Sequence, residues 1–336
     1  MPTGVEENAE LDLLSEREKG QLIKTVGIKT RRIAPPETCA SDLCLAAAGP
    51  LLEKLNWDPR EIEALVFVTQ TPDHSIPGTA TQLAHRLGLP KSALALDINQ
   101  GCAGFVYGLA TIASLLATGG IRKALLLVGD TITRVLSPQD KSTQPIFSDA
   151  GSATALEFAE GAAPMHFNLQ SSGKGYHAII VPEGGARQPI REGSHDITEQ
   201  EGGLLRAPAH MAMKGLDIFN FALAEVAPNL LELLAFAGSD IDAPDHFVFH
   251  QANLLLNESI RKKLRIPREK TPYSLPHLGN TSCATIPITL VDQLQEGLRA
   301  ENKLLALSGF GVGLSWGAAL LHTDKIACLP LIEHHP

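Results

Sequence analysis

Residues 93–117 read ALALDINQGCAGFVYGLATIASLLA, and this stretch decides the fold class. It opens with a short apolar run, Ala93–Ile98, which predicts a strand. It closes with Gly104–Ala117, which is apolar nearly all round and therefore indicates a helix buried in the core. Between them lies the turn Asn99–Ala103, whose glycine allows the chain to bend tightly around Cys102. A strand, a tight turn and a buried helix together favour an α/β protein.

The same alternation continues on both sides of this stretch. In the first half we expect strands at Ala64–Thr71 and Lys123–Thr131 and a helix at Thr79–Leu87. In the second half we expect strands at His246–His250 and Lys303–Ser308, and helices at Leu254–Leu264 and Thr285–Leu298. Each half therefore has a strand, a polar loop that opens a helix, and another strand. We interpret this as a structural duplication built on mainly parallel sheets.

The boundary between the two halves is expected near residue 161. Residues 1–161 would form the half that carries Cys102, and residues 162–336 the other half. The segment Gly161–Arg206 is rich in glycine, proline and charge, so we interpret it as connection and surface loops that partly cover the site. The stretch up to Lys24 is polar and holds one apolar helix stripe at most.

The composition excludes several classes of protein. Of the 336 residues, 44% are hydrophobic and 19% are charged, which is an ordinary globular balance. The longest apolar runs are too short to cross a bilayer, and the N-terminus does not have the pattern of a signal peptide. The net charge of −9 argues against general nucleic-acid binding. These features indicate a cytoplasmic protein that acts on neither nucleic acid nor membrane.

The five cysteines point to a reducing compartment. Their number is odd, and none has histidines at metal-ligand spacing. We therefore expect free thiols, no metal and no redox cofactor. The cysteines are Cys39, Cys44, Cys102, Cys283 and Cys328.

Cys102 is the candidate nucleophile. It stands where a strand ends and a buried helix begins, which resembles the mechanics of a nucleophile elbow. Backbone N–H groups and the helix dipole at such a position favour a thiolate. The alternative is a small buried hydrophobe at a crowded turn, and since buried free cysteines are common, the local pattern leaves both open.

His250 and Asn280 are the other candidates. His250 follows the apolar run Phe247–Phe249, and parallel sheets place functional groups at such strand ends. A hydrogen-bonded structural histidine is the more common explanation for a single such residue. Asn280 lies in Leu278-Gly-Asn-Thr-Ser282 before a helix, where asparagine is a usual N-cap. Each motif alone says little.

Two further patterns have competing explanations. The glycines of Gly309-Phe-Gly-Val-Gly313 follow a strand but do not continue as GxGxxG, so a dinucleotide site is not expected. They would instead let backbone N–H groups approach a substrate oxygen. Basic residues also gather in and after the expected helix Leu254–Leu264. There they form either a solvated helix face or a docking patch for an acidic partner. They are Arg261, Lys262, Lys263, Arg265, Arg268 and Lys270.

In combination these motifs are far more specific. NQGCAGF, HQAN, GNTS and GFGVGLSWG, in that order, resemble the β-ketoacyl-acyl-carrier-protein synthase III family over nearly the whole chain. The resemblance implies a thiolase-like fold, with two similar halves in a five-layer αβαβα sandwich, and a homodimer. It implies an acyltransferase that starts fatty acid biosynthesis. Elongating ketosynthases use Cys-His-His, and thiolases carry a second catalytic cysteine; neither pattern is present here.

The resemblance also implies roles for individual residues. Cys102 would attack an acyl thioester, from coenzyme A or a carrier protein, with the oxyanion between the N–H groups of Cys102 and Val312. His250 and Asn280 would stabilise the enolate formed from malonyl-acyl carrier protein. The expected substrate-binding residues are Asn253, Phe310, Gly311, Val312 and, from the dimer partner, Ile76. The expected carrier-docking residues are Arg261, Lys262, Lys263 and Arg265.

The sequence departs from the family pattern on the side that would hold coenzyme A. Gln21 and Thr25 stand where many members have tryptophan and arginine, and Lys141 stands for a second arginine. Leu216 replaces an asparagine near the pantetheine arm, and Leu255 replaces an arginine associated with carrier docking. The catalytic residues of the family pattern are therefore all present. Whether coenzyme A or a carrier protein brings the acyl thioester is left open by these departures. Alternative functions are an acyltransferase of the same fold that acylates an alcohol or amine, a non-catalytic ketosynthase subunit, and a binding module.

Overall fold

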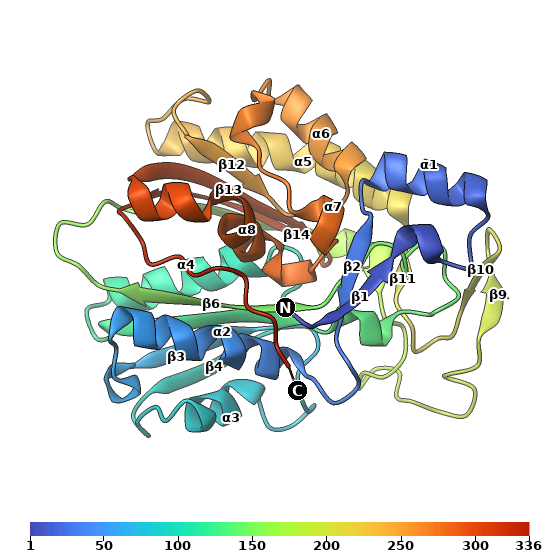
Figure 1. The fold of residues 1–336 in the computed structure, drawn as a ribbon, viewed down its shortest axis with the longest axis horizontal. Coiled ribbons are helices and arrows are strands. Elements are labelled where there is room, and N and C mark those ends of the chain that lie inside the picture. The colour runs from blue at the N-terminus through green and yellow to red at the C-terminus, as the bar shows by residue number, and fades with distance from the viewer. Residues whose placement is uncertain (336) are drawn as a thin grey trace.

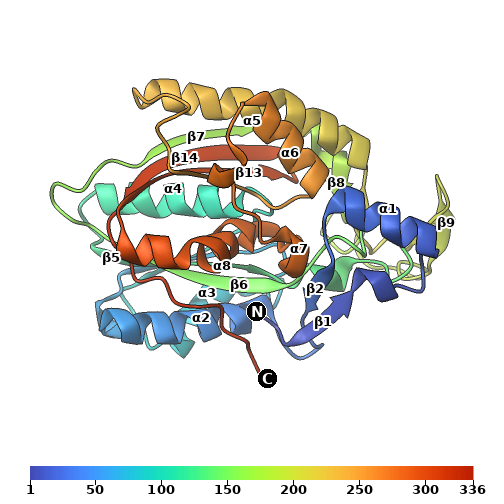
Figure 2. The same ribbon diagram turned by 45° about the horizontal axis from the view of Figure 1, so that its top comes forward.

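The computed structural model describes residues 1–335, which fold into five layers. Helices α5 and α6 form one outer layer, and α2 and α3 form the other (Figure 1). Two sheets lie inside them, and α4 and α8 lie between the sheets (Figure 2). The expected αβαβα sandwich is therefore confirmed. The helices are α1 (Glu16–Val26), α2 (Ala40–Leu55), α3 (Thr79–Arg86), α4 (Gly104–Ala117), α5 (Gly215–Phe236), α6 (Leu254–Lys263), α7 (Leu275–Leu278) and α8 (Thr285–Ala300).

The first sheet has the order β4-β3-β5-β6, and the second has the order β12-β13-β14-β7. In the first, β3 runs parallel to β4 and β5, and β6 runs antiparallel to β5. Its strands are β3 (Ala64–Val68), β4 (Leu94–Ile98), β5 (Lys123–Asp130) and β6 (Ala150–Glu157). The second sheet consists of β7 (His166–Ser171), β12 (His246–Phe249), β13 (Lys303–Gly311) and β14 (Ser315–Thr323).

The two sheets share a pattern of strand directions. The set β12, β13 and β14 runs parallel and then antiparallel, as β3, β5 and β6 do. Both sheets press apolar residues onto α4, which is why this helix can be apolar nearly all round. We propose that the halves meet between β6 and β7, because β6 closes the first sheet and β7 belongs to the second. This division stays a proposal.

The segment Gly161–Arg206 was predicted as connection and loops only, and this is wrong in one part. It contains β7, which pairs with β14 over six residue pairs and is an integral strand of the second sheet. Beyond β7 the segment has a 3-10 turn, Gly173–Ala178, and short strands. These are β8 (Ile179–Ile180), β9 (Thr198–Gln200) and β10 (Leu204–Arg206), followed by β11 (Ala212–Met213).

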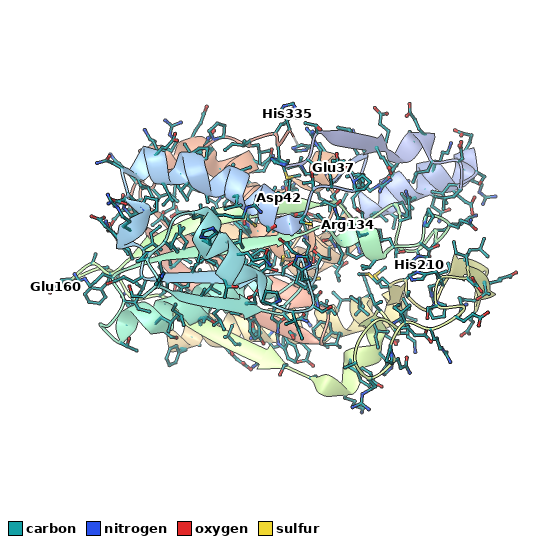
Figure 3. The ribbon with its side chains drawn as sticks, turned by 90° about the horizontal axis from the view of Figure 1, so that it is seen from below. Glu37, Asp42, Arg134, Glu160, His210 and His335 are labelled. Carbon is teal, nitrogen blue, oxygen red and sulfur yellow. The ribbon has the colours of Figure 1, made fainter. Side chains whose placement is uncertain are left out.

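The N-terminal stretch packs beside the sandwich. Strands β1 (Gly4–Glu7) and β2 (Thr30–Ile33) form a separate antiparallel pair. Between them, α1 begins with a capping box, in which Ser15 and Glu18 exchange hydrogen bonds. Arg134, after β5, donates to the carbonyl oxygens of Pro36 and Thr38, at 2.6 Å each, and so ties the loop that enters α2 (Figure 3).

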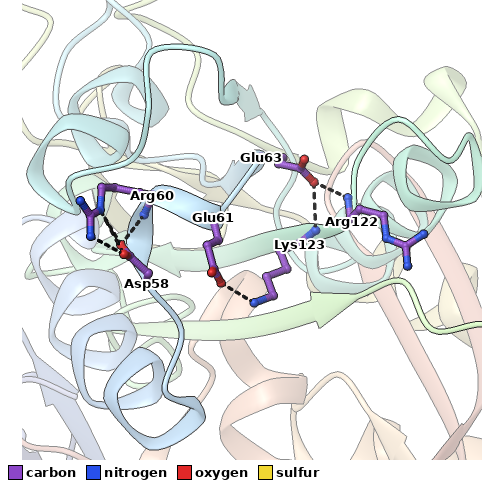
Figure 4. Close-up of polar contacts among 6 residues, drawn as sticks. All are labelled: Asp58, Arg60, Glu61, Glu63, Arg122 and Lys123. Atoms are coloured by element: carbon purple, nitrogen blue, oxygen red, sulfur yellow. Dashed lines mark hydrogen bonds and ion pairs between the residues drawn. The ribbon is translucent and has the colours of Figure 1, made fainter.

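The first sheet is anchored by charged residues where its strands begin. Glu61 accepts a hydrogen bond from Lys123 Nζ at 2.6 Å, and Glu63 accepts from the backbone N–H groups of Arg122 and Lys123 (Figure 4). Parallel strands carry their functional groups at the opposite, C-terminal edge. This ion pair and the hydrogen bonds of Glu63 therefore fix the strands at the edge away from their C-terminal ends.

One helix of the described residues, α5, is long and apolar enough to cross a membrane by length and composition. Its apolar residues, among them Ala222, Val226 and Leu230, are buried against the second sheet and α6. The core helix of a globular domain passes the same test, and α5 forms the outer layer over β13, β14 and β7.

Candidate active site

Cys102, His250 and Asn280 line one pocket, although they come from three separate parts of the chain. Cys102 precedes α4, His250 follows β12, and Asn280 lies between α7 and α8. The pocket has a volume of about 90 Å³ and is otherwise mostly apolar. Its other lining residues are Ile146, Phe147, Ile179, Met213, Gly215, Ile218, Phe219, Ala252, Asn253, Leu256, Phe310 and Gly311.

The turn that carries Cys102 is held by close backbone contacts. Gly104 N–H donates to the Gly101 carbonyl at 2.6 Å, so the chain reverses directly into α4. A Cβ on Gly101 would lie 2.3 Å from Gln70 Oε1 and 2.4 Å from Val312 Cγ1. Any larger residue at position 101 would therefore displace the turn. Cys102 itself is only 7% exposed.

Burial controls the acidity of Cys102. It raises the pKa of this thiol to about 11, and the backbone N–H groups of Val312 and of Cys102 oppose the shift. The expectation that the helix start favours a thiolate is therefore wrong for the ligand-free protein, because the loss of solvation outweighs the nearby N–H groups. The same two N–H groups converge on the sulfur, which is the arrangement that an oxyanion hole requires.

The glycines of residues 309–313 allow the second sheet to touch this turn. The strand β13 runs through Gly309 and Gly311, so these glycines do not form a loop after the strand. A Cβ on Gly309 would lie 2.8 Å from Ala103 Cα, and one on Gly311 would lie 2.6 Å from Cys102 Sγ. Both positions are glycine because the strand passes against the nucleophile turn.

His250 is buried against Thr285 and Phe310. Its Nδ1 lies 2.7 Å from Thr285 Oγ1, and its ring meets Phe310 edge-on with centroids 5.6 Å apart. Burial lowers the pKa of His250 to about 3, and a backbone hydrogen bond with Ser282 opposes this only in part. The imidazole is therefore neutral at any ordinary working pH.

Asn280 is oriented by the backbone that follows it. Ser282 N–H donates to Asn280 Oδ1 at 2.9 Å, so the amide Nδ2 is the atom that can donate to a ligand. Ser282 has a φ of 52°, a left-handed conformation uncommon for serine. Asn280 does not cap α8, whose N-cap is Ala284 without a side-chain bond. The explanation of Asn280 as an N-cap is therefore wrong.

The other predicted substrate-binding residues divide into two groups. Asn253, Phe310 and Gly311 line the pocket, and Val312 borders the Cys102 turn. Asn253 is also the N-cap of α6, since its Oδ1 accepts from Leu256 N–H at 2.9 Å. Ile76 is not part of the pocket; its side chain is 88% exposed on the surface.

Known proteins resemble the chain along almost its entire length. The family model described as 3-oxoacyl-[acyl-carrier-protein] synthase III matches residues 96–173, and the model of its C-terminal part matches residues 234–323. The β-ketoacyl-[acyl-carrier-protein] synthase III of Desulfitobacterium hafniense strain Y51 is 32% identical over 326 residues, which cover 97% of this chain and 96% of that protein. The chain belongs to the β-ketoacyl-acyl-carrier-protein synthase III family. The resemblance predicted from the motifs is thus confirmed.

Solved structures agree with this family. A 3-oxoacyl-(acyl-carrier protein) synthase from Burkholderia xenovorans superposes with a TM-score of 0.93 at 39% identity, over 99% of this chain and 94% of that one. The priming β-ketosynthase of the R1128 polyketide pathway superposes with a TM-score of 0.79 at 26% identity, over 97% of this chain and 94% of that one. The thiolase-like fold is therefore shared across the synthase III family and a polyketide relative.

The departures from the family pattern lie together at one end of the molecule. Gln21 and Thr25 are on α1, and Lys141 Nζ is bonded to Glu18 Oε1 of the same helix at 3.0 Å. Leu216, on the first turn of α5, and Leu255, on the first turn of α6, are 71% and 50% exposed. A lysine held by a carboxylate offers less positive charge to a phosphate than a free arginine does.

The four predicted docking residues are not equally available. Arg261 is bonded to Glu258 and to the Ile266 carbonyl, and Lys263 donates to the Leu223 carbonyl at 2.5 Å. Lys262 and Arg265 are exposed at the C-terminal end of α6. Lys262 lies about 14 Å along the helix axis from Asn253, and Arg265 follows the C-cap of the helix.

Three residues that support the site were not predicted. Buried Asp130 accepts bonds from Gln70 N–H at 2.7 Å and from Cys283 Sγ at 3.2 Å, which joins the first sheet to the turn before α8. Thr285 contacts His250, and Ser282 orients Asn280. Ser282 belongs to GNTS and Thr285 follows it, whereas Asp130 ends the buried strand β5, far from that motif in the sequence. Among residues 1–335, no group of three histidine, cysteine or acidic side chains could hold a metal ion.

Proposed function

We propose that this protein catalyses the decarboxylating condensation of an acyl thioester with a malonyl thioester, as its relatives' names indicate for synthase III enzymes. The reaction starts fatty acid biosynthesis. The observation that carries the proposal is the meeting of Cys102, His250 and Asn280 in one narrow pocket. No observation favours the alternative acyl transfer to an alcohol or amine.

The first step is transfer of the acyl group to Cys102. Its sulfur forms a bond to the thioester carbonyl carbon, and the carbon–sulfur bond of the incoming thioester breaks. The leaving thiolate takes up the proton that Cys102 gives up. The N–H groups of Cys102 and Val312 bind the oxyanion, which supports acylation of a thiol whose pKa is raised to about 11.

The second step is the condensation. The malonyl thioester loses carbon dioxide, and the electron pair of the broken carbon–carbon bond forms an enolate. Donors from His250 and Asn280 stabilise its oxygen, which is favoured because His250 is neutral and Asn280 presents its amide Nδ2. The enolate carbon attacks the acyl group on Cys102. The products are a β-ketoacyl thioester and the Cys102 thiolate, which is reprotonated from solvent.

We propose that substrates enter beside Asn253 and Met213, where the pocket is lined by α5 and α6. Asn253 would position the pantetheine arm, while Phe310 and Gly311 would shape the space around Cys102. The reaction as written is balanced without a metal or an organic cofactor. Lys262 and Arg265 are the docking residues whose charges are exposed to an acidic carrier protein.

We propose a homodimer formed through β4. This strand is an edge of the first sheet, and two of its leucines, Leu94 and Leu96, are 40% and 39% exposed. Long apolar edge strands are usually covered in native proteins. The exposed Ile76 would then reach the acyl pocket of the partner.

The test measures both half-reactions in one set of variants. Intact mass after incubation with acyl-CoA and acyl-carrier thioesters should reveal an acyl adduct that Cys102→Ser lacks. His250→Ala and Asn280→Ala should still acquire the adduct but should release carbon dioxide from malonyl thioester at least tenfold more slowly, since each loses a donor to the enolate oxygen. An adduct mapped to another cysteine, or full decarboxylation by Asn280→Ala, would exclude the proposal.

A further inference from the structure

The condensation proposed above needs a hydrogen atom on the ring nitrogen of His250 that faces the substrate. A neutral imidazole has one N–H, so the ring is a donor on one side and an acceptor on the other. Which nitrogen carries the proton is set by the partner of the other nitrogen. Besides the backbone of Ser282, which also bonds the ring, that partner is Thr285, whose Oγ1 lies 2.7 Å from Nδ1. Resting on the proposed function, the inference concerns this contact.

The Thr285 hydroxyl has two possible acceptors. One is His250 Nδ1 at 2.7 Å, and the other is the Ser282 carbonyl oxygen at 3.2 Å. The shorter contact has the ordinary length of a hydroxyl hydrogen bond, and the longer one exceeds it. The Ser282 carbonyl already accepts the backbone N–H of Thr285 in the short turn that opens α8. It therefore does not require the hydroxyl proton as well.

We propose that the Thr285 hydroxyl donates to Nδ1 of His250 and so keeps the ring proton on Nε2, toward the pocket. Thr285 is then a positioning residue, which acts on the substrate through His250. It stands at the first position of α8, and its side chain is 1% exposed. Water cannot replace a hydroxyl at such a position without opening the core, so loss of the Thr285 hydroxyl leaves Nδ1 without this donor.

The arrangement also couples the two enolate donors. Ser282 N–H fixes Asn280 Oδ1, while the Ser282 carbonyl begins the turn that places Thr285 beside His250. The left-handed conformation of Ser282 directs its N–H and carbonyl to these two partners. One short segment, residues 280–285, therefore presents Nδ2 of Asn280 and Nε2–H of His250 to the same pocket.

The test combines a tautomer measurement with two half-reactions. ¹⁵N-histidine-labelled enzyme should give a His250 spectrum, assigned with His250→Gln, in which Nδ1 is the unprotonated nitrogen. Thr285→Val keeps the shape and removes the hydroxyl. It should move the ring proton partly or wholly to Nδ1 and should slow malonyl decarboxylation about 10- to 100-fold, because a buried nitrogen loses its donor. Self-acylation and KM should change little, and Thr285→Ser should restore the parent spectrum and rate.

Thr289→Val is the matched control. Thr289 is fully buried on the same helix and bonds Ser274 Oγ and the Thr285 carbonyl, so its loss disturbs the core without reaching His250. Thr289→Val should match Thr285→Val in thermal stability and should decarboxylate the malonyl thioester at the parent rate. A proton on Nδ1 in the parent enzyme, or unchanged decarboxylation in Thr285→Val, would overturn the proposal. Absent decarboxylation in the parent, with the tautomer as expected, would instead reject the proposed function.

Discussion

At the scale of single residues, burial determines the charge state of the side chains at the site. Cys102, His250 and Asn280 were recognised from motif order, and they line one pocket. Their electrostatic state depends on burial, which no local pattern reveals. Thr285 and Asp130 could not be predicted either, because threonine and aspartate near a helix start or strand end usually serve as caps.

The buried neutral state of His250 predicts how stability responds to acid. Its pKa is lowered from 6.5 to about 3 in the folded protein, so below pH 6.5 the unfolded chain binds a proton that the folded chain does not. This residue therefore costs stability increasingly as the pH falls from 6.5 toward 3. Between pH 7 and pH 5 its cost should be about 2 kcal/mol.

The measurement is urea unfolding of the parent and of His250→Gln at both pH values. The parent should lose about 2 kcal/mol more than the variant, in which the titrating ring is absent. Equal losses in the two proteins would mean that the folded protein protonates His250 as easily as the unfolded chain does.

At the scale of elements, the strands that end at the site were predicted well. Short β-branched or apolar runs such as Ala64–Val68 and Lys123–Asp130 are distinctive because both faces of each strand are buried. Helix α5 was missed, since it holds Pro228 and its apolar residues are spread around it. Strand β7 was missed because its sequence, HFNLQS, is polar enough for a loop and its pairing with β14 is not local.

The C-terminal end of α6 should steer the carrier protein. Lys262→Glu with Arg265→Glu should lower kcat/KM for malonyl-carrier protein roughly 3- to 10-fold at low salt, because exposed charges act on the rate of encounter. The loss should shrink as salt rises. Activity with a small malonyl thioester should stay within twofold of the parent.

The matched control is Lys54→Glu with Lys325→Glu, which makes the same change of net charge elsewhere on the exposed surface. A similar loss in this control would assign the effect to net charge. Unchanged kcat/KM in the α6 variant would place the docking surface elsewhere.

At the scale of the whole molecule, assembly was implied by resemblance alone, and the dimer through the exposed edge strand β4 is a proposal. Leu94→Glu with Leu96→Glu should convert a dimer to a monomer in light scattering, since two charges would be buried in an apolar contact. The control is Leu231→Glu with Phe236→Glu on α5, where the side chains are 47% and 78% exposed and the dimer mass should persist. A dimer that survives the β4 changes would require another interface.

The protonated thiol of Cys102 has a consequence for survival of the enzyme between turnovers. Peroxides attack thiolates, and a buried thiol with a pKa of about 11 presents almost none at neutral pH. Oxidation of Cys102 to a sulfenic or sulfinic acid is therefore expected to be slow in the ligand-free protein.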